Sequence, residues 1–149
     1  MHFMGVQEIS ASRADVWRAL NDPAIIQQCI PGCERYEEIE PAKYEAVVVA
    51  SIGPVWASFT ATVTVSDHVL DEGYRIEAKG SGVMAGLGNL AASVDLVDSE
   101  WGTSLSYSAE AQISDSLSHL GSHLIQAAAT RFSEAFFARF NALLVSGAE

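Results

Sequence analysis

The chain has 149 residues, a size typical of one folded domain, and 49% of its residues are apolar. Its net charge of −11 argues against nucleic acid and against docking on anionic lipid, because both favour Lys and Arg. No apolar run is long enough to span a membrane, and residues 1–10 lack the basic start and apolar centre of a signal peptide. We therefore expect a cytoplasmic protein without disulfides.

The first part of the chain predicts a strand followed by two short helices. Residues 3–9 favour the strand, and Ser12 is a typical N-cap for the first helix. Asn-Asp-Pro at residues 21–23 ends that helix, because the residue before proline avoids helical angles. Residues 24–30 favour the second helix, which stops at the Pro31–Gly32 turn.

From residue 33 to about residue 114 the pattern changes to strands. Residues 55–69 alternate clearly between apolar and polar side chains, which is typical of a half-buried strand. Short turn sequences separate the strands, so we expect hairpins and an antiparallel sheet. The expected strands are two within residues 34–53, on either side of residues 41–43, and then residues 55–69, 74–82, 90–97 and 103–113.

Residues 116–145 favour one long helix, for which Ser114, Asp115 and Ser116 are candidate caps. Its apolar residues make two neighbouring stripes, of the kind that packs on a sheet. The first stripe is Leu117, Leu120, Leu124 and Ala128, and the second is Ile125, Phe132, Phe136, Phe140 and Leu143. We expect one domain over residues 1–149.

A twisted sheet that curls around a straight helix leaves a space that large side chains or a ligand must fill. The expected inward positions of the sheet are small: Ala46, Ala50, Ala57, Ala61, Ala78, Gly80, Gly82, Ala92, Ala109 and Ala111. Close packing of these small residues is the alternative to a pocket. We favour an apolar pocket, because Phe132, Phe136 and Phe140 on the helix would hold the two layers apart.

The Gly-rich residues 79–89 superficially resemble a phosphate-binding loop. They are not followed by a helix and lack the Gly-Lys-Ser/Thr ending of such a loop, so we interpret them as a flexible hairpin. Val83, Met84 and Leu87 would then form an apolar lip at the mouth of the pocket.

Cys29 and Cys33, the only cysteines, flank the Pro31–Gly32 turn. A zinc site would need His119 and His123 as well, but Leu120 stands where the metalloprotease pattern has Glu. The redox pattern Cys-x-x-Cys is one residue shorter than this spacing. We therefore interpret the thiols as partly buried groups beside a turn, and we expect no metal site.

Several segments of the sequence resemble the family of CoxG, a subunit of carbon monoxide dehydrogenase. The resemblance runs from about Gly5 to Phe137, and the ordered motifs DP, IPGC, IGP, GSG and GT…Y are fairly specific to the family. The segments are VWRALNDPAIIQQCIPGCERYE, SIGPVWASFTATVTV, KGSGVMAGLGNLAASVDL, GTSLSYSAEAQI and LGSHLIQAAATRFSEAFF. The family belongs to the START-like, polyketide cyclase or SRPBCC superfamily. The resemblance therefore implies an α+β helix-grip fold, with a seven-stranded antiparallel curved sheet wrapped on a long C-terminal helix and two short helices after the first strand.

Members of this family accompany molybdenum hydroxylases of the carbon monoxide dehydrogenase type and are associated with membrane recruitment and isoprenoid quinone. The resemblance implies a non-catalytic accessory protein that binds an apolar small molecule, a quinone, and needs no cofactor. Longer members carry a C-terminal tail thought to attach them to the membrane. This chain ends soon after the helix, so we expect at most transient contact with the inner face of the cytoplasmic membrane. The expected contact rim is Ile25, Ile26, Val83, Met84 and Leu87.

The resemblance and the strand pattern together indicate which residues bind the ligand. These are Ala50, Phe59, Ala61, Val63, Ala78, Gly80, Gly82, Met84, Leu90, Ala92, Tyr107, Leu120, Leu124, Ala128 and Phe132. One alternative is a cyclase- or dehydratase-like enzyme of the same superfamily, which would use polar groups such as Tyr44, Tyr74 and Tyr107. None of the three has an obvious His or carboxylate partner in its motif, so we expect no catalytic residue. The other alternative is a ligand-free assembly factor with a filled core.

Overall fold

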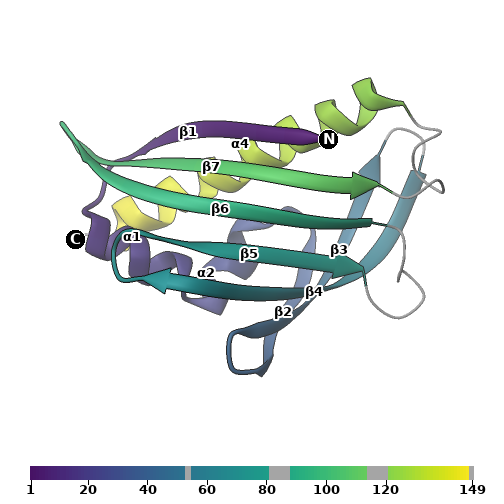
Figure 1. Cartoon of the computed structure of the whole chain (residues 1–149), viewed down its shortest axis with the longest axis horizontal. Helices are drawn as coiled ribbons and strands as arrows, with labels where there is room; N and C mark the ends of the chain where they lie inside the picture. The colour runs from purple at the N-terminus through teal and green to yellow at the C-terminus, as the bar shows by residue number, and fades with distance from the viewer. Residues whose placement is uncertain (53–54, 81–87, 114–120, 148–149) are drawn as a thin grey trace.

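The computed structural model describes residues 1–52, 55–80, 88–113 and 121–147 (Figure 1). One strand precedes two short helices, and the remaining strands lie between these helices and one long helix. The α+β helix-grip fold expected from the sequence is therefore confirmed. The elements are β1 (His2–Ile9), α1 (Arg13–Leu20), α2 (Pro23–Cys29), β2 (Cys33–Glu40), β3 (Lys43–Ile52), β4 (Val55–Val69), β5 (Gly73–Gly80), β6 (Gly88–Ser99), β7 (Gly102–Ile113) and α4 (Ser122–Gly147).

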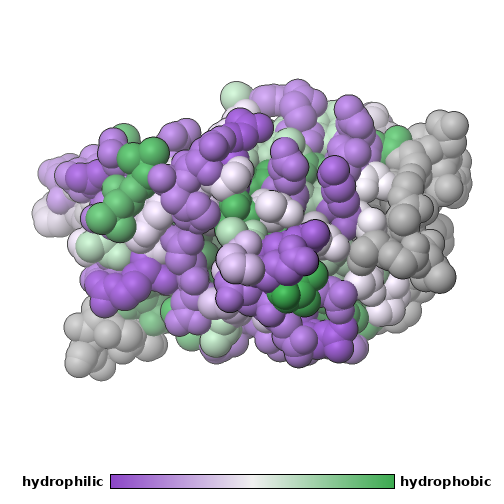
Figure 2. Space-filling view, turned by 60° about the horizontal axis from the view of Figure 1, so that its bottom comes forward, coloured by the Kyte–Doolittle hydropathy of each residue, from purple (hydrophilic) through white to green (hydrophobic). Residues whose placement is uncertain are grey.

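The seven strands form one antiparallel sheet in the order β1-β7-β6-β5-β4-β3-β2. Strands β2 to β7 follow the chain order, and β1 closes the other edge by pairing with β7. The sheet curves, with α4 running behind it and both short helices on the same side as α4 (Figure 1). Hydrophilic residues cover most of the surface seen in Figure 2, as expected of the outer face of such a sheet.

Side-chain caps begin both short helices. The Ser12 side chain accepts a hydrogen bond from the backbone N–H of Asp15 at 3.2 Å, as its place in the sequence predicts. Helix α2 begins at Pro23, one residue earlier than expected, because proline fits the first helical position well. Asp22 caps this helix by accepting a hydrogen bond from the backbone N–H of Ala24 at 3.0 Å.

The turn that carries the two cysteines depends on Gly32. Gly32 has a φ of +74°, and a Cβ there would collide with the Val49 carbonyl oxygen. The Gly32 carbonyl also accepts a hydrogen bond from the Val49 N–H at 2.9 Å, which ties the turn to β3. Both thiols are free: Cys29 is buried, and Cys33 donates to the Arg35 carbonyl at 3.2 Å. His119, which the metal interpretation needs, lies outside the described residues.

The long helix begins later than expected. Gly121 has a φ of +88°, outside the helical region, so α4 starts at Ser122 rather than at residue 116. The Gly121 carbonyl accepts the first helical hydrogen bond, from the N–H of Ile125 at 3.3 Å. The three expected caps, at residues 114–116, lie outside the described residues, as do residues 81–87 between β5 and β6.

The hydrophobic core lies at the end of the molecule where α4 finishes. Phe140 is fully buried there against Ile9, Val16 and Leu105. The Asn141 side chain donates to the Glu8 carbonyl and accepts from the Ser10 N–H, both at 3.3 Å, which anchors the helix to β1. The first half of α4 is much more exposed, so the sheet and helix do not close together along their whole length.

Candidate ligand-binding site

A cavity of about 760 Å³ lies between the concave face of the sheet, α2 and α4. Most of its lining side chains are apolar, and each of the seven strands contributes at least one lining residue. Helix α2 contributes Ile26, and Ile30 follows at its end. A volume of this size is typical of small-molecule sites in proteins.

A row of paired positions across the sheet forms the wall of the cavity. Val65 pairs with Ile76, Ile76 with Ala92, Ala92 with Ala109, and Ala109 with Phe3. All of these residues line the cavity. The two adjacent alanines leave depth in the middle of the row, where larger residues would fill the space.

The first half of α4 meets the cavity with a different set of residues from the stripe that the sequence suggested. The lining residues at its start are spaced three and four apart, so they share one helical face, and they are mostly small or polar: Gln126, Ala129, Thr130 and Ser133. Leu124 and Ala128, which we expected at the ligand, lie on another side of the helix, and Leu124 is exposed. The sequence pattern misled because we assumed that the most apolar stripe faces the sheet along the whole helix.

The remaining predicted site residues divide into three groups. Those that line the cavity are Val63, Ala78, Leu90, Ala92, Tyr107 and Phe132. Phe59, Ala61 and Gly80 do not line it, since they lie nearer the start of β4 and the end of β5 than the residues of these strands that do. The side chains of Ala50, Gly82, Met84 and Leu120 lie outside the described residues. Of the expected contact rim, Ile26 lines the cavity, Ile25 packs against the core, and the other three residues are not described.

Sequence reasoning missed Tyr36, whose ring stacks on Tyr44 with 5.0 Å between centroids and 12° between planes. Glu38 pairs with Tyr44, and Tyr36 pairs with Ala46, so the tyrosines are diagonal neighbours on one face of the β2–β3 hairpin. The signal available in the sequence was the spacing of Tyr36 and Tyr44 on either side of the hairpin turn, which places both rings on one face of the hairpin.

Tyr107 holds α4 to the sheet at the cavity wall. Its hydroxyl lies 2.8 Å from the Ser133 hydroxyl, and its ring stacks on Phe137 with centroids 5.9 Å apart. Both groups of this hydrogen bond line the cavity. Tyr107 and Ser133 therefore satisfy each other without a ligand.

The cavity reaches solvent between β1 and the first half of α4. Met4 on β1 is 70% exposed and Phe132 on α4 is 46% exposed, yet both line the cavity. An apolar ligand would thus meet the Phe132 ring at the entrance, beside the exposed edge strand β1. Within the described part of the chain, no helix combines the length and apolar character needed to cross a membrane.

A curved antiparallel sheet that grips a long C-terminal helix above an apolar cavity defines a START-like, or SRPBCC, protein. A conserved protein from Geobacillus kaustophilus has a similar structure, with 25% identity and a TM-score of 0.89, covering 98% of this chain and 96% of that one. The structure of Ara h 8.0201 is also similar, at 14% identity and a TM-score of 0.73, covering 98% of both chains. So is a Chromobacterium violaceum protein, at 19% identity and a TM-score of 0.72, covering 96% of both.

Within this class, the chain belongs to the family of CoxG, a subunit of carbon monoxide dehydrogenase, and the sequence model of that family matches residues 5–145. The match confirms the resemblance inferred from the motifs. A comparison with curated proteins found no match.

Proposed function

We propose that this protein is a non-catalytic carrier of an isoprenoid quinone that serves a molybdenum hydroxylase of the carbon monoxide dehydrogenase type. The observation that carries this proposal is the apolar cavity of about 760 Å³ with an entrance edged by Met4 and Phe132. An isoprenoid tail is insoluble in water, and each methylene that it buries contributes about 0.8 kcal/mol. The cavity offers it an apolar space, and the lining aromatic rings suit a flat quinone ring.

The family name supports the choice of partner, because it describes a subunit of carbon monoxide dehydrogenase. Such an enzyme must pass electrons on, and a membrane quinone is a suitable acceptor. A carrier needs only brief contact with the inner face of the cytoplasmic membrane to collect its ligand. With a net charge of −11, attraction to anionic lipid cannot supply that contact, so the apolar entrance must.

Two adjacent alanines on β6 provide the test of the carrier. Ala92 lines the cavity, whereas Ala91, its neighbour along the strand, points to the opposite face. We expect Ala92→Trp to fill the cavity and abolish quinone binding, while Ala91→Trp keeps the parent's affinity. Titration with a soluble short-chain quinone, followed by tryptophan or ligand fluorescence, measures both.

Native mass spectrometry and organic extraction of freshly purified protein identify the ligand. A co-purified quinone that is absent from Ala92→Trp supports the carrier. Equal quinone binding by parent and Ala92→Trp would place the ligand elsewhere. A parent that binds no apolar molecule would leave the ligand-free assembly factor as the function, and chemical turnover of a bound molecule would favour the enzyme.

A further inference from the structure

Three tyrosines from three different strands line one region of the cavity: Tyr36 on β2, Tyr44 on β3 and Tyr74 on β5. The rings of the first two stack on each other, as described above. Tyr74 is only 7% exposed, and it is held by Trp17, which meets it edge-on at 5.7 Å, and by His68, which stacks on it at 5.6 Å. These contacts fix the direction in which each phenol ring points.

The Tyr74 hydroxyl is a buried polar group that no described residue satisfies with a hydrogen bond. A buried hydroxyl without a partner costs free energy, so proteins rarely leave one. The other polar groups of the cavity differ from it. Tyr107 and Ser133 are paired with each other, and Gln126 and Thr130 are exposed to water. The unmet hydrogen bond therefore lies in the tyrosine region, away from the entrance.

All three tyrosines remain protonated at physiological pH. Burial raises the pKa of Tyr74 and of Tyr36 well above the ordinary value. The neighbouring Tyr36 and Tyr44 raise the pKa of Tyr74 further, and Tyr44 and Cys33 do the same for Tyr36. Burial and the Glu38 carboxylate raise the pKa of Tyr44. The Tyr44 hydroxyl already donates to Glu38, so the hydroxyls of Tyr36 and Tyr74 are the neutral O–H donors open to a ligand.

The charge around this region selects against an anionic partner. Glu38 lies beside Tyr44, and the described lining of the cavity includes no Lys or Arg. A carboxylate or phosphate would lose its hydration without gaining a counter-charge. A neutral oxygen acceptor, such as a carbonyl, has no such cost.

We propose that Tyr36, Tyr44 and Tyr74 form a subsite in which the hydroxyls of Tyr74 and Tyr36 donate hydrogen bonds to a neutral carbonyl oxygen on the ring of the bound ligand, while Tyr44 stacks on Tyr36. This inference rests on the proposed carrier function and adds the orientation of the ligand. The carbonyl-bearing ring lies at the tyrosines, near Ile26 and Ile30 of the α2 region, and the tail extends toward the entrance at Phe132. The ring is therefore deep in the cavity during transport.

The test uses two probes that differ in their carbonyl groups: a para-benzoquinone with a decyl tail, and decylbenzene. We expect Tyr74→Phe to weaken quinone binding roughly three- to tenfold, the usual effect of losing one hydrogen bond, and to leave decylbenzene binding unchanged. Tyr107→Phe is the matched control, because its hydroxyl also lines the cavity but is paired with Ser133. It should not change the ratio of the two affinities.

Infrared spectroscopy supplies a second measurement. Its carbonyl band would not change if Tyr74 only stabilised the fold. The carbonyl stretch of the bound quinone should lie below its frequency in hexane, and it should shift back in Tyr74→Phe. If Tyr74→Phe does not fold, Tyr36→Phe and the infrared spectrum of the parent complex decide the question.

The two proposals fail in different ways. Quinone that binds the parent with an unshifted carbonyl band, or with a preference over decylbenzene that survives the Phe variants, overturns the tyrosine subsite and leaves the carrier standing. A parent that binds neither probe overturns both.

Discussion

The Tyr107 hydroxyl on β7 lies 2.8 Å from the Ser133 hydroxyl on α4, which joins the sheet to the long helix at the wall of the cavity. The Tyr107 ring lies directly over Gly5, its paired residue on β1. A Cβ on Gly5 would lie only 2.7 Å from the tyrosine oxygen and 2.8 Å from Cζ. The hydrogen bond between sheet and helix therefore depends on the absence of a side chain at Gly5.

We expect Gly5→Ala to displace the Tyr107 ring, break its hydrogen bond to Ser133 and lower the free energy of unfolding by about 1–3 kcal/mol. Urea denaturation measures the change. Val6→Ala is the control, because the neighbouring Val6 side chain is exposed and should alter stability by no more than about 0.5 kcal/mol. Equal stability of parent and Gly5→Ala would show that Tyr107 adapts without loss.

The face of α4 that meets the ligand can be tested with another adjacent pair of alanines. Ala129 lines the cavity and Ala128 does not. We expect Ala129→Trp to reduce quinone affinity at least tenfold, because its indole would occupy the ligand's volume, whereas Ala128→Trp keeps most of the affinity. Calorimetric titration measures both. If Ala128→Trp instead lowers quinone affinity more than Ala129→Trp does, the ligand contacts the helix face that the apolar stripe predicted.

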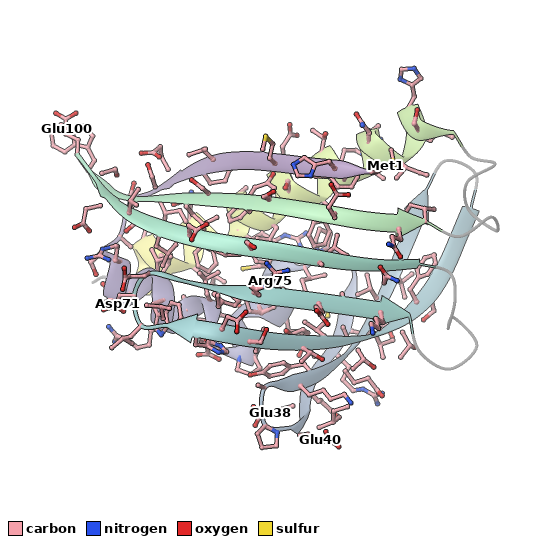
Figure 3. The ribbon with its side chains drawn as sticks, in the orientation of Figure 1. Met1, Glu38, Glu40, Asp71, Arg75 and Glu100 are labelled. Atoms are coloured by element: carbon pink, nitrogen blue, oxygen red, sulfur yellow. The ribbon has the colours of Figure 1, made fainter. Side chains whose placement is uncertain are left out.

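The entrance of the cavity predicts how quinone is collected. Met4 and Leu70 are exposed to similar extents, 70% and 73%, but only Met4 lines the cavity. Asp71, next to Leu70, lies at the opposite end of the molecule from Met1 (Figure 3). We expect Met4→Asp to slow transfer from quinone-loaded liposomes severalfold and Leu70→Asp to have little effect.

Transfer should also be insensitive to salt, because the acidic protein gains nothing from anionic lipid. Sedimentation followed by extraction of quinone from the protein measures it. Binding to liposomes that persists through washing, or transfer that Met4→Asp leaves unchanged, would contradict a mobile carrier with this entrance.

The two thiols should contribute to stability alone. Cys29 is fully buried, so replacing Cys29 and Cys33 together by Ser places hydroxyls where thiols packed well. We expect a loss of about 1–3 kcal/mol in the free energy of unfolding, with quinone affinity unchanged. Stoichiometric zinc in the parent that disappears from the double variant would instead show a metal site.

The buried thiols and phenols also predict how stability depends on pH. Burial raises the pKa of Cys29 and Cys33 in the folded state above their ordinary value of 9.0, so the unfolded chain releases these protons first. Their contribution is complete below pH 9.0 and is lost as the pH rises through the folded-state values. Unfolding at increasing pH should therefore show a steady fall in stability, by up to about 1.4 kcal/mol per pH unit for each group.

The buried tyrosines should extend this fall beyond 10.0, their ordinary pKa. In the variant with Ser at both Cys29 and Cys33, the free energy of unfolding should begin to fall only above pH 10.0. A parent whose stability is constant through the alkaline range would show that these groups are not buried in solution.

Local chemistry was enough to predict most elements of the fold. The alternation of residues 55–69 gave β4 its observed bounds, and Ser12 caps α1 as its position indicates. The Pro31–Gly32 turn was also correct, because only glycine fits there without a collision with β3. Two helix starts differed, at Pro23 and Ser122, and each difference has its cause in a single residue whose backbone angles favour or interrupt a helix.

The sequence by itself determined the strands, the caps, the order of the hairpins and the membership of a family, since these depend on neighbouring residues and on motifs. Only the tertiary structure decided which helix face meets the cavity and which tyrosines gather there. The rotation of α4 is set by contacts between residues far apart in the chain, such as Asn141 with Glu8 and Ser10, and by the burial of Phe140. Likewise, Tyr36 and Tyr74 come together through the pairing of β2 to β5, which no local pattern encodes.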